Sequence, residues 1–306
     1  MSASNTIAIT GASGMIGQAL TAALQADGRT ILPISRHAIP GGTRWDPGRG
    51  ILDTGALEGV DAIIHLAGES IAAGRWTPAR KTLLRESRLT PTRLLAETIG
   101  RLTQPPRVLI SASAVGIYGN RGDERLDERA TFGTDFLARL GQEWEAAADP
   151  ARAVGVRVVH PRFGVVLSTT GGALKKLLPP FRLGLGGPVG DGKQWLAWIA
   201  ISDVVGVVRH LLANADLAGP VNAVAPGEVT NGEFGRILGR VLHRPAVLPL
   251  PAFALKLAFG EMAEATLLAS QRVVPAVLSQ SGYQWSFPEL EPALQAIVHP
   301  TAVDRR

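Results

Sequence analysis

Short apolar runs alternate with longer stretches of helical periodicity through the first half of the chain. The runs that predict strands are Thr6–Thr10, Thr30–Ile34, Ala62–Leu66, Arg107–Ser111 and Val156–His160. Between them, apolar residues recur with helical spacing at Ile16–Ala26, Pro78–Leu102 and Asp135–Ala148. Strands that alternate with helices are typical of βαβ units, whose strands lie parallel in one sheet. The pattern therefore predicts an α/β fold with a doubly wound parallel sheet.

The pattern changes after Leu167, where glycines at 171–172 and between 184 and 192 indicate a loop-rich stretch. Further along, we expect strands at Trp195–Ile201 and Val221–Val224, and helices at Asp203–Leu212, Asn231–Leu242, Ala252–Ala269 and Pro288–Ile297. The division that follows is a first domain over residues 1–170, which also receives about 197–226. A smaller, interleaved C-terminal part is formed by 171–196 and 227–300.

The first predicted strand runs into a glycine-rich turn, Thr10–Gly17, and then into an amphipathic helix. Glycine permits positive φ and a close approach of the backbone to a ligand. A helix N-terminus offers free N–H groups and partial positive charge to a phosphate. A turn without a ligand is the alternative, but the strand before it and the helix after it favour the dinucleotide site of a Rossmann domain. The expected contacts are Thr10, Gly11, Ser13, Gly14, Met15 and Ile16.

The end of the second strand indicates which dinucleotide is bound. NAD-binding domains of this class usually have an acidic residue there, which bonds the ribose 2′-OH. This chain has Ser35 and Arg36 instead. A guanidinium can pair with a 2′-phosphate, so the sequence favours NADP over NAD. A surface arginine with no ligand is the alternative.

Other cofactor contacts are expected where the third predicted strand ends. Small residues there let a dinucleotide lie across the sheet, and we assign Leu66, Ala67 and Gly68 to this role. Arg88 is a candidate phosphate or substrate clamp, with a solvated helix charge as the alternative. His65 lies inside the apolar run and is interpreted as a packed strand residue.

Composition limits the other functions. The 306 residues are 46% hydrophobic and 19% charged, with a net charge of +5 and no cysteine, which excludes disulfides and thiolate chemistry. Basic residues are scattered, so we expect no nucleic-acid partner. The first strand begins near residue 6, which leaves no room for a signal peptide, and no apolar run could cross a bilayer. We expect a cytoplasmic protein with no membrane partner and no metal site.

Several segments resemble the extended short-chain dehydrogenase/reductase superfamily, which contains sugar-nucleotide epimerases and dehydratases. They are Thr10–Gly17, His65–Gly68, Ile117–Gly119, Arg162–Leu167 and Trp198–Asp203. The resemblance covers nearly the whole chain. It implies a Rossmann domain over 1–170 that binds NADP and a C-terminal part that binds an unknown small-molecule substrate. Members often dimerise through helices of the nucleotide domain, so a homodimer is expected.

A closer resemblance is to an atypical branch, the epimerase-family proteins with a characteristic C-terminal module, some of which are mislabelled as cell-division inhibitors. The segments that carry it are Ala67–Glu69, Arg75–Thr77, Ser87–Arg88, Ser113–Gly119, Glu143–Glu145, Gln271–Pro275, Gly282–Trp285 and Pro288–Leu290. The branch is inferred to bind NADP, and its substrate is not established.

The usual catalytic pair of the superfamily is missing. That pair is Tyr-x-x-x-Lys, in which the tyrosine is the general acid/base and the lysine lowers its pKa. The chain has two tyrosines, Tyr118 and Tyr283, and neither is followed by lysine four positions later. Alignment of the helix at 135–148 on Glu145 puts Leu137 and Gly141 at the tyrosine and lysine positions.

Two functional hypotheses remain. In the first, the protein is an NADP-dependent oxidoreductase or epimerase-like enzyme with a non-standard acid/base. The candidates are Ser113, Tyr118 and Glu69, with Lys81 as a further one, and Arg162, Trp195 and Trp198 as substrate contacts. Each has a structural alternative: a rim aromatic, a solvated helix charge or a core residue. In the second hypothesis, the protein binds NADP without turnover and is a sensor or regulator.

Overall fold

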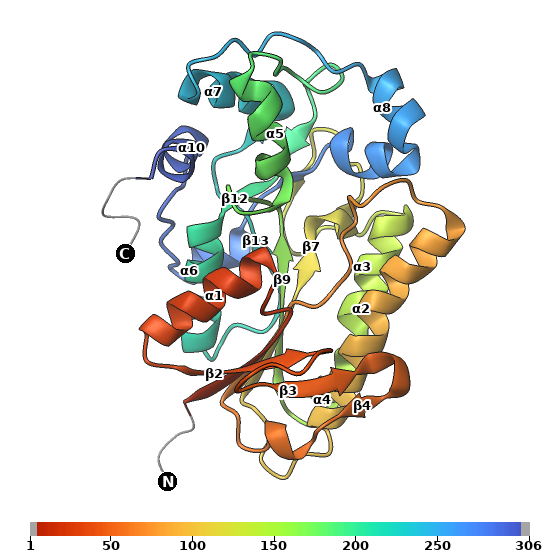
Figure 1. Cartoon of the computed structure of the whole chain (residues 1–306), viewed down its shortest axis with the longest axis vertical. Helices are drawn as coiled ribbons and strands as arrows, with labels where there is room; N and C mark the ends of the chain where they lie inside the picture. Colours follow the sequence, from red (N-terminus) through yellow and green to blue (C-terminus); the bar gives the residue numbers. More distant parts are fainter. Residues whose placement is uncertain (1–4, 301–306) are drawn as a thin grey trace.

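One large sheet forms the centre of the computed structural model, which describes residues 5–300 (Figure 1). The strand order is β4-β3-β2-β1-β5-β6-β9-β13, with β7 beside β9, and all pairs are parallel except β3–β4. The order reverses between β1 and β5, which is the switch point of a doubly wound sheet. The predicted fold class is confirmed. The strands are β1 (Thr6–Thr10), β2 (Thr30–Ser35), β3 (Thr43–Asp46), β4 (Ile51–Leu52), β5 (Ala62–His65), β6 (Val108–Ser111), β7 (Ser113–Ala114), β9 (Arg157–Phe163) and β13 (Gly219–Ala223).

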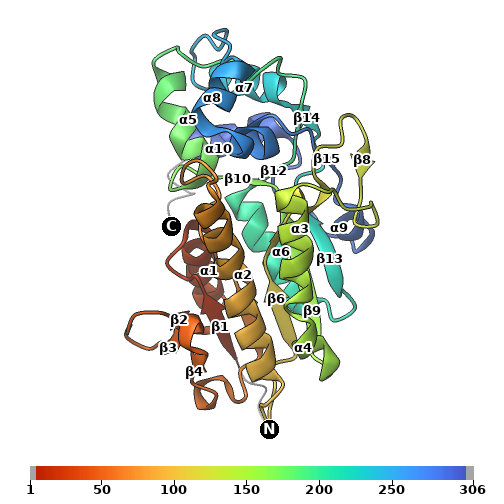
Figure 2. The same cartoon turned by 90° about the vertical axis from the view of Figure 1, so that its right-hand side faces the viewer.

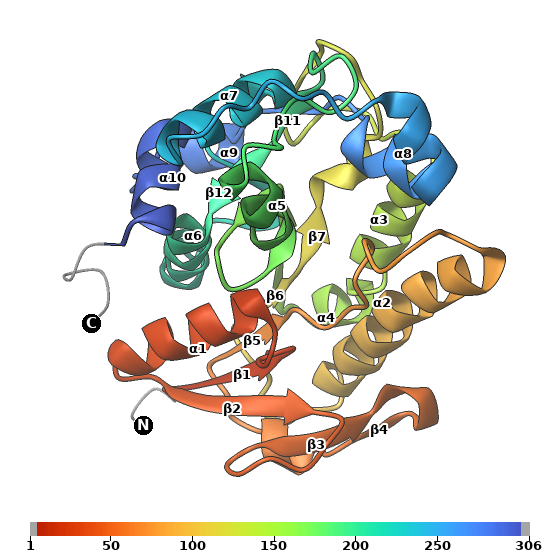
Figure 3. The same ribbon diagram turned by 45° about the horizontal axis from the view of Figure 1, so that its top comes forward.

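Helices cover both faces of this sheet because its strands are apolar on both sides. Ile7 and Ile9 pack with α1 on one face, while Ala8, Ile63 and Leu109 pack with α2 and α4 on the other. Figure 3 shows α1 and α6 on one side and α2, α3 and α4 on the other. Their bounds are α1 (Met15–Ala26), α2 (Pro78–Ile99), α3 (Phe136–Ala146), α4 (Asp149–Ala153) and α6 (Ile201–Ala213).

The C-terminal part lies beyond the carboxyl ends of the central strands, at the top of Figure 2. Its helices are α5 (Gly172–Arg182), α7 (Asn231–Val241), α8 (Ala252–Phe259) and α10 (Leu290–Val298), whereas α9 (Ala276–Gln280) lies lower, beside β13 of the large sheet. Three two-stranded sheets join it to the rest: β10 (Val165–Leu167) with β12 (Trp198–Ala200), β11 (Trp195–Leu196) with β14 (Val229–Thr230), and β8 (Arg125–Leu126) with β15 (Arg272–Val273). The segment between β12 and β14 supplies α6 and β13 to the large domain. Among the helices described, none is long and apolar enough to cross a membrane.

Two predicted elements are interrupted. The strand expected at Trp195–Ile201 is divided at Ala197, because β11 pairs with β14 whereas β12 pairs with β10. At the division, the Ala197 carbonyl accepts the N–H of Val165 (2.8 Å). The single helix predicted at Ala252–Ala269 is also interrupted. Helix α8 ends at Phe259, because the φ of 58° at Gly260 is outside the helical region. A π-helical turn follows at Ala263–Leu267.

The stretch interpreted as loop-rich contains α5, which was not predicted. Leu174, Leu178 and Phe181 are buried at helical spacing in it. The flanking glycines and the prolines at 179 and 180 obscured this short pattern. The hairpin β3–β4 was also missed because its strands are only four and two residues long.

The His65 side chain forms hydrogen bonds that connect the end of β1, beside the glycine turn, with helix α2. The Thr10 hydroxyl accepts the N–H groups of Leu66 (3.0 Å) and Ala67 (3.2 Å), so its own proton points to His65 Nδ1 (2.7 Å). The ring proton is therefore on Nε2, which donates to the hydroxyl of Thr92 in α2 (2.9 Å). The predicted packed role of His65 is confirmed by its complete burial.

This burial predicts a pH dependence of stability. Burial lowers the pKa of His65 from 6.5 to about 4, so the unfolded chain takes up this proton at a higher pH than the folded chain does. Between pH 6.5 and pH 4, the free energy of unfolding should fall by roughly 3 kcal/mol on account of this group. Denaturant unfolding at pH 7, 5 and 4 measures the fall.

The His65→Gln variant, which cannot titrate there, should lose less stability over the same pH range. His160, whose pKa burial also lowers, is present in both proteins and its effect cancels in the comparison. Equal acid sensitivity of the two proteins would show that His65 is not the titrating group.

Candidate functional site

The glycine turn between β1 and α1 is held tightly against the end of β5. Gly11 has a φ of 68°, and a Cβ placed on it would lie 3.1 Å from the backbone carbon of Leu66. A Cβ on Gly17 would lie 2.2 Å from the Gly11 carbonyl oxygen, so a side chain cannot fit at this position. Gly17 was part of the sequence motif but not of the predicted contacts. Its role is to let α1 approach the turn.

The N-terminus of α1 offers an anion site. Its N-cap is Gly14, which has no side-chain acceptor, and its first turn carries no acidic residue. Within the described part of the chain, no hydrogen bond uses the N–H groups of Met15, Ile16 and Gly17. The Met15 side chain contacts Gly171 and Gly172, where a Cβ would lie 3.1 and 3.5 Å from it. These free donors and this glycine-lined approach fit the pyrophosphate of a dinucleotide.

Ser35 and Arg36 stand where β2 ends, next to β1 at the same edge of the sheet. The Ser35 hydroxyl accepts the N–H of His37 (3.2 Å). Arg36 is exposed and makes no hydrogen bond or ion pair with a described residue. The strand register places the exposed Arg44 opposite Ser35, a second cation that the sequence did not indicate. This edge therefore carries two guanidinium groups without a carboxylate partner.

Arg88 lies beside the end of β5, where its guanidinium donates hydrogen bonds to two backbone carbonyl groups. Its guanidinium donates to the carbonyls of Glu69 (2.9 Å) and Leu84 (3.0 Å), and it lies 5.1 Å from the ring centroid of Trp144. A Cβ on Gly68 would lie 3.5 Å from it. Burial lowers the pKa of Arg88 to about 10, partly offset by the charge of Glu69, so Arg88 is protonated at neutral pH. Arg88 thus supports the strand end, and its contact with a cofactor stays a prediction.

A buried ion pair joins β9 to α3. Arg162 donates to both carboxylate oxygens of Glu145 (2.8 and 2.9 Å), and the Ser113 hydroxyl donates to the same carboxylate (2.7 Å). Burial by itself would raise the pKa of Glu145, but the hydrogen bonds and charge of Arg162 lower it. Glu145 is therefore a stable carboxylate and a weak base. It holds the Ser113 hydroxyl in one orientation.

Tyr118 belongs to the same buried network. Its hydroxyl accepts from Arg162 (2.8 Å) and donates to the side chain of Asn222 (2.7 Å). Burial raises the pKa of Tyr118 although Arg162 acts in the opposite direction, and the residue has no exposed surface. The structure therefore brings together Ser113, Tyr118 and Arg162, but each of their polar groups is engaged with protein. Contact of these three residues with a substrate stays a prediction.

The α3 positions that align with the usual tyrosine and lysine, Leu137 and Gly141, are tightly packed. A Cβ on Gly141 would lie 3.0 Å from the Ile117 side chain, and Leu137 packs against Gly116. Gly141 and Glu145 both lie on the buried side of α3, four residues apart. Sequence reasoning did not assign a role to Glu145, although a carboxylate on the buried face of an amphipathic helix was the available signal.

A cleft of about 660 Å³ lies between the start of α3 and the α8 region. This volume is in the range of small-molecule sites. Its polar lining comes from segments distant in sequence, namely Asn120, Asp135, Asp191, Gln194, Lys256, Glu261 and Glu264. None of these was predicted. The Lys81 ammonium, next to the Phe136 ring, forms an ion pair with Glu261 at this cleft.

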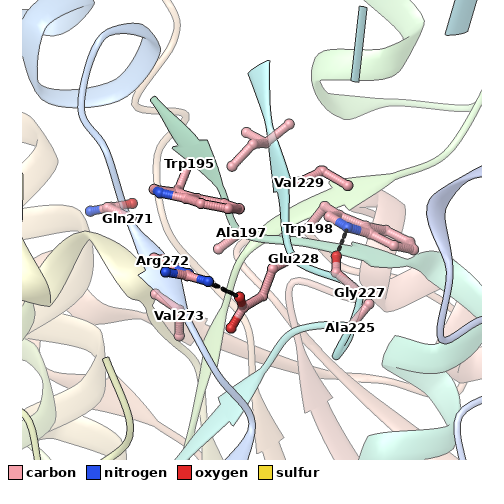
Figure 4. Close-up of a pocket in the computed structure, with 11 residues that line it drawn as sticks. Trp195, Ala197, Trp198, Ala225, Gly227, Glu228, Val229, Gln271, Arg272 and Val273 are labelled. Atoms are coloured by element: carbon pink, nitrogen blue, oxygen red, sulfur yellow. Dashed lines mark hydrogen bonds and ion pairs between the residues drawn. The ribbon is translucent and has the colours of Figure 1, made fainter. Parts of the chain in front are cut away.

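The predicted substrate residues Trp195 and Trp198 lie elsewhere, around a cavity of about 10 Å³ (Figure 4). Such a space holds about one water molecule. Trp195 stacks on Arg272, whose guanidinium pairs with Glu228, and the Trp198 indole donates to the Gly227 carbonyl (2.8 Å). Trp198 is 1% exposed and is a core residue. Within residues 5–300, no cluster of three or more histidine or acidic side chains is arranged to hold a metal ion.

The sheet order and the glycine-lined helix N-terminus at its switch point define a dinucleotide-binding protein of the doubly wound α/β class. The chain belongs to the NAD dependent epimerase/dehydratase family, whose model matches residues 7–224. A second model, a domain of unknown function called DUF1731, matches residues 250–297. The predicted resemblance, including its C-terminal module, is confirmed.

Several known proteins are similar over more than nine-tenths of this chain. An epimerase family protein of Mycobacterium bovis is 45% identical over 281 residues, which are 91% of this chain and 93% of the relative. The crystal structure of the human epimerase family protein SDR39U1 with NADPH has a TM-score of 0.89 and 37% identity, covering 97% of this chain and all of that one. A nucleoside-diphosphate sugar epimerase from Corynebacterium glutamicum has a TM-score of 0.80 and 38% identity, covering 96% of this chain and 58% of its own.

The packing of α3 can be tested with Gly141→Ala. The added methyl would lie 3.0 Å from Ile117, so we expect a loss of about 1–3 kcal/mol in the free energy of unfolding. Gly100→Ala is the matched control, because Gly100 has a helical φ of −64° and its nearest neighbour would be 3.4 Å away. That control should be neutral or stabilising. Equal effects of the two substitutions in denaturant unfolding would contradict the close approach of α3 to Ile117.

Proposed function

We propose that this protein binds NADP(H) at the β1–α1 turn and uses it in an oxidation–reduction step on a small molecule in the neighbouring cleft. The observation that carries the proposal is the α1 N-terminus, with free N–H groups, a glycine N-cap and no acidic residue. Arg36, just after β2, and Arg44 of β3, opposite Ser35, have no described carboxylate partner and favour the 2′-phosphate of NADP. The human relative solved with NADPH supports the same cofactor.

The reduced cofactor, when bound, supplies a hydride, and the reacting oxygen then needs a proton. Of the three predicted acid/base residues, Ser113 and Tyr118 are buried, whereas the Glu69 side chain is 39% exposed. Glu69 follows directly on the strand end Leu66–Gly68, and its carboxylate lies 3.7 Å from Arg80. We therefore assign the proton exchange to Glu69, because its carboxylate is the one of the three predicted groups that solvent reaches. Ser113, held by Glu145, is the second choice.

A non-catalytic NADP-binding regulator is the second candidate function. The observation that favours it is the packing of Leu137 and Gly141, which leaves no space for the tyrosine and lysine of the usual mechanism. The cofactor cradle is the same under either function, so binding alone does not separate them.

The cofactor proposal predicts the effect of Arg36→Asp. Loss of a charge-assisted contact, and repulsion of the 2′-phosphate, should weaken NADPH binding at least about tenfold while NADH binding changes little. Titration of nucleotide fluorescence measures both constants. Arg101→Asp, at the far end of α2 beside Glu97, is the charge-matched control and should leave both unchanged. Equal weakening of NADPH and NADH would refute the role of Arg36.

Hydride transfer separates the two functions. The protein is incubated with NADPH deuterated at nicotinamide C4 and a panel of carbonyl compounds and sugar nucleotides, and deuterium in the products is measured. An enzyme transfers deuterium, and Glu69→Gln should lower the rate about hundredfold, with Glu86→Gln on the exposed side of α2 as control. Tight NADPH binding with no transfer to any compound would favour the regulator.

A further inference from the structure

Large apolar side chains are exposed at one pole of the molecule, where the α7–α8 connection passes the end of α5 and leads into α8 (Figures 1 and 3). We call this group the apolar ridge. It consists of Leu183, Leu185, Val247, Leu248, Phe253 and Leu257. Four of them, Leu183, Val247, Phe253 and Leu257, are 74–76% exposed. Scattered apolar residues at a surface need no explanation, but a continuous group does.

The ridge is one surface because backbone contacts join its segments. The N–H of Leu248 donates to the Gly186 carbonyl (3.0 Å), and the N–H of Leu250 donates to the Pro188 carbonyl (2.8 Å). A Cβ on Gly187 would lie 2.0 Å from the Leu248 carbonyl oxygen, so the backbone of the loop after α5 is in direct contact with the α7–α8 connection. The exposed leucines after α5 are thereby fixed beside the segment that leads into α8.

Helix α8 is apolar on nearly all sides. Its sequence is AFALKLAF, with Lys256 as the one polar residue. Leu255 faces the interior at 4% exposure, whereas Phe253 and Leu257, one turn apart, face outward together. A helix that is apolar all round is normally covered by protein or by lipid. Within the chain described here, nothing covers the outer face of α8.

The charges at the ridge are mainly positive. Arg182 and Arg244 are exposed at its α5 end, and neither forms an ion pair with a described carboxylate. Arg75 lies at the other end, where it donates to the Leu257 carbonyl (3.0 Å). The nearby acidic groups Glu261 and Glu264 are paired with Lys81 and Lys256. An anionic surface therefore complements the ridge.

We propose that the apolar ridge docks this protein on the surface of an anionic lipid bilayer. Phe253, Leu257 and the leucines of the ridge would enter the boundary between headgroups and acyl chains, and Arg182 and Arg244 would meet lipid phosphates. A second copy of the chain packed α5 end to α5 end would bring these unpaired arginines together, and a dimer through the ridge in any other orientation is an outcome that the test distinguishes. Surface attachment is distinct from spanning a membrane, which no described helix can do.

Docking in this way would place the 660 Å³ cleft beside the bilayer. Helix α8 supplies Ala252 and Lys256 to the cleft lining, and Phe253 and Leu257 to the ridge. On this helix, Ala252 and Lys256 would thus face the cleft, while the adjacent Phe253 and Leu257 would face the lipid.

The test is sedimentation of the full chain with vesicles of phosphatidylcholine alone or of phosphatidylcholine with about one third phosphatidylserine, whose negative charge attracts basic residues. We expect binding to the anionic vesicles, weakened several-fold by raising the salt from about 0.05 to 0.5 M. Phe253→Asp/Leu257→Asp should reduce the partition coefficient at least about tenfold. Arg182→Glu/Arg244→Glu should reduce binding to anionic vesicles only.

The matched control is Ile51→Asp/Val154→Asp, which makes the same chemical change at exposed positions in β4 and after α4, at the opposite pole. It should bind vesicles like the unmodified protein, and all variants should keep the circular dichroism spectrum and NADPH affinity. Absence of binding to anionic vesicles, or equal loss in the control, overturns the proposal. So does light scattering that shows a dimer which Phe253→Asp/Leu257→Asp converts to a monomer without any vesicle binding.

Discussion

The guanidinium of Arg162 is a buried charge that the surrounding structure has to neutralise. An unpaired charge at 2% exposure would be strongly destabilising, and Glu145 removes that cost through two hydrogen bonds. The remaining donor of Arg162 reaches Tyr118, which is bonded in turn to Asn222 of β13. One charge thereby connects β9, α3 and β13, and it fixes how the helix α3 lies against the carboxyl ends of the strands.

This position of α3 has a chemical consequence. The helix lies so close to Ile117 that even a methyl group at position 141 would crowd its side chain, and the Glu145 carboxylate is paired with Arg162. The helix that carries proton-transfer groups elsewhere in the superfamily is therefore a packing element here. The cofactor turn, by contrast, keeps every feature that a dinucleotide requires. The two sides of the site therefore differ: the turn offers free backbone donors, whereas the polar groups that face α3 are engaged with protein.

The C-terminal module acts at the boundary between the cofactor domain and the cleft. Arg75 donates to the Leu257 carbonyl, and Lys81 pairs with Glu261, so the segment after β5 and the start of α2 both touch the α8 region. The exposed ridge, the cleft lining and the contacts to the segment after β5 thus all involve one short helical segment. Gly260 makes this possible because its positive φ turns the chain between α8 and the following π turn.

The sequence by itself determined the doubly wound sheet, the cofactor turn and the packed His65, because these depend on periodicity and on contacts between neighbouring segments. It also determined that the usual tyrosine and lysine are absent. Only the tertiary structure decided that Tyr118 and Arg162 are buried together, that Trp198 is a core residue and that Asn120, Asp135 and Glu261 share a cleft. The reason is physical: burial, charge pairing and clefts arise from residues tens to hundreds of positions apart, and local patterns carry no information about which of them meet.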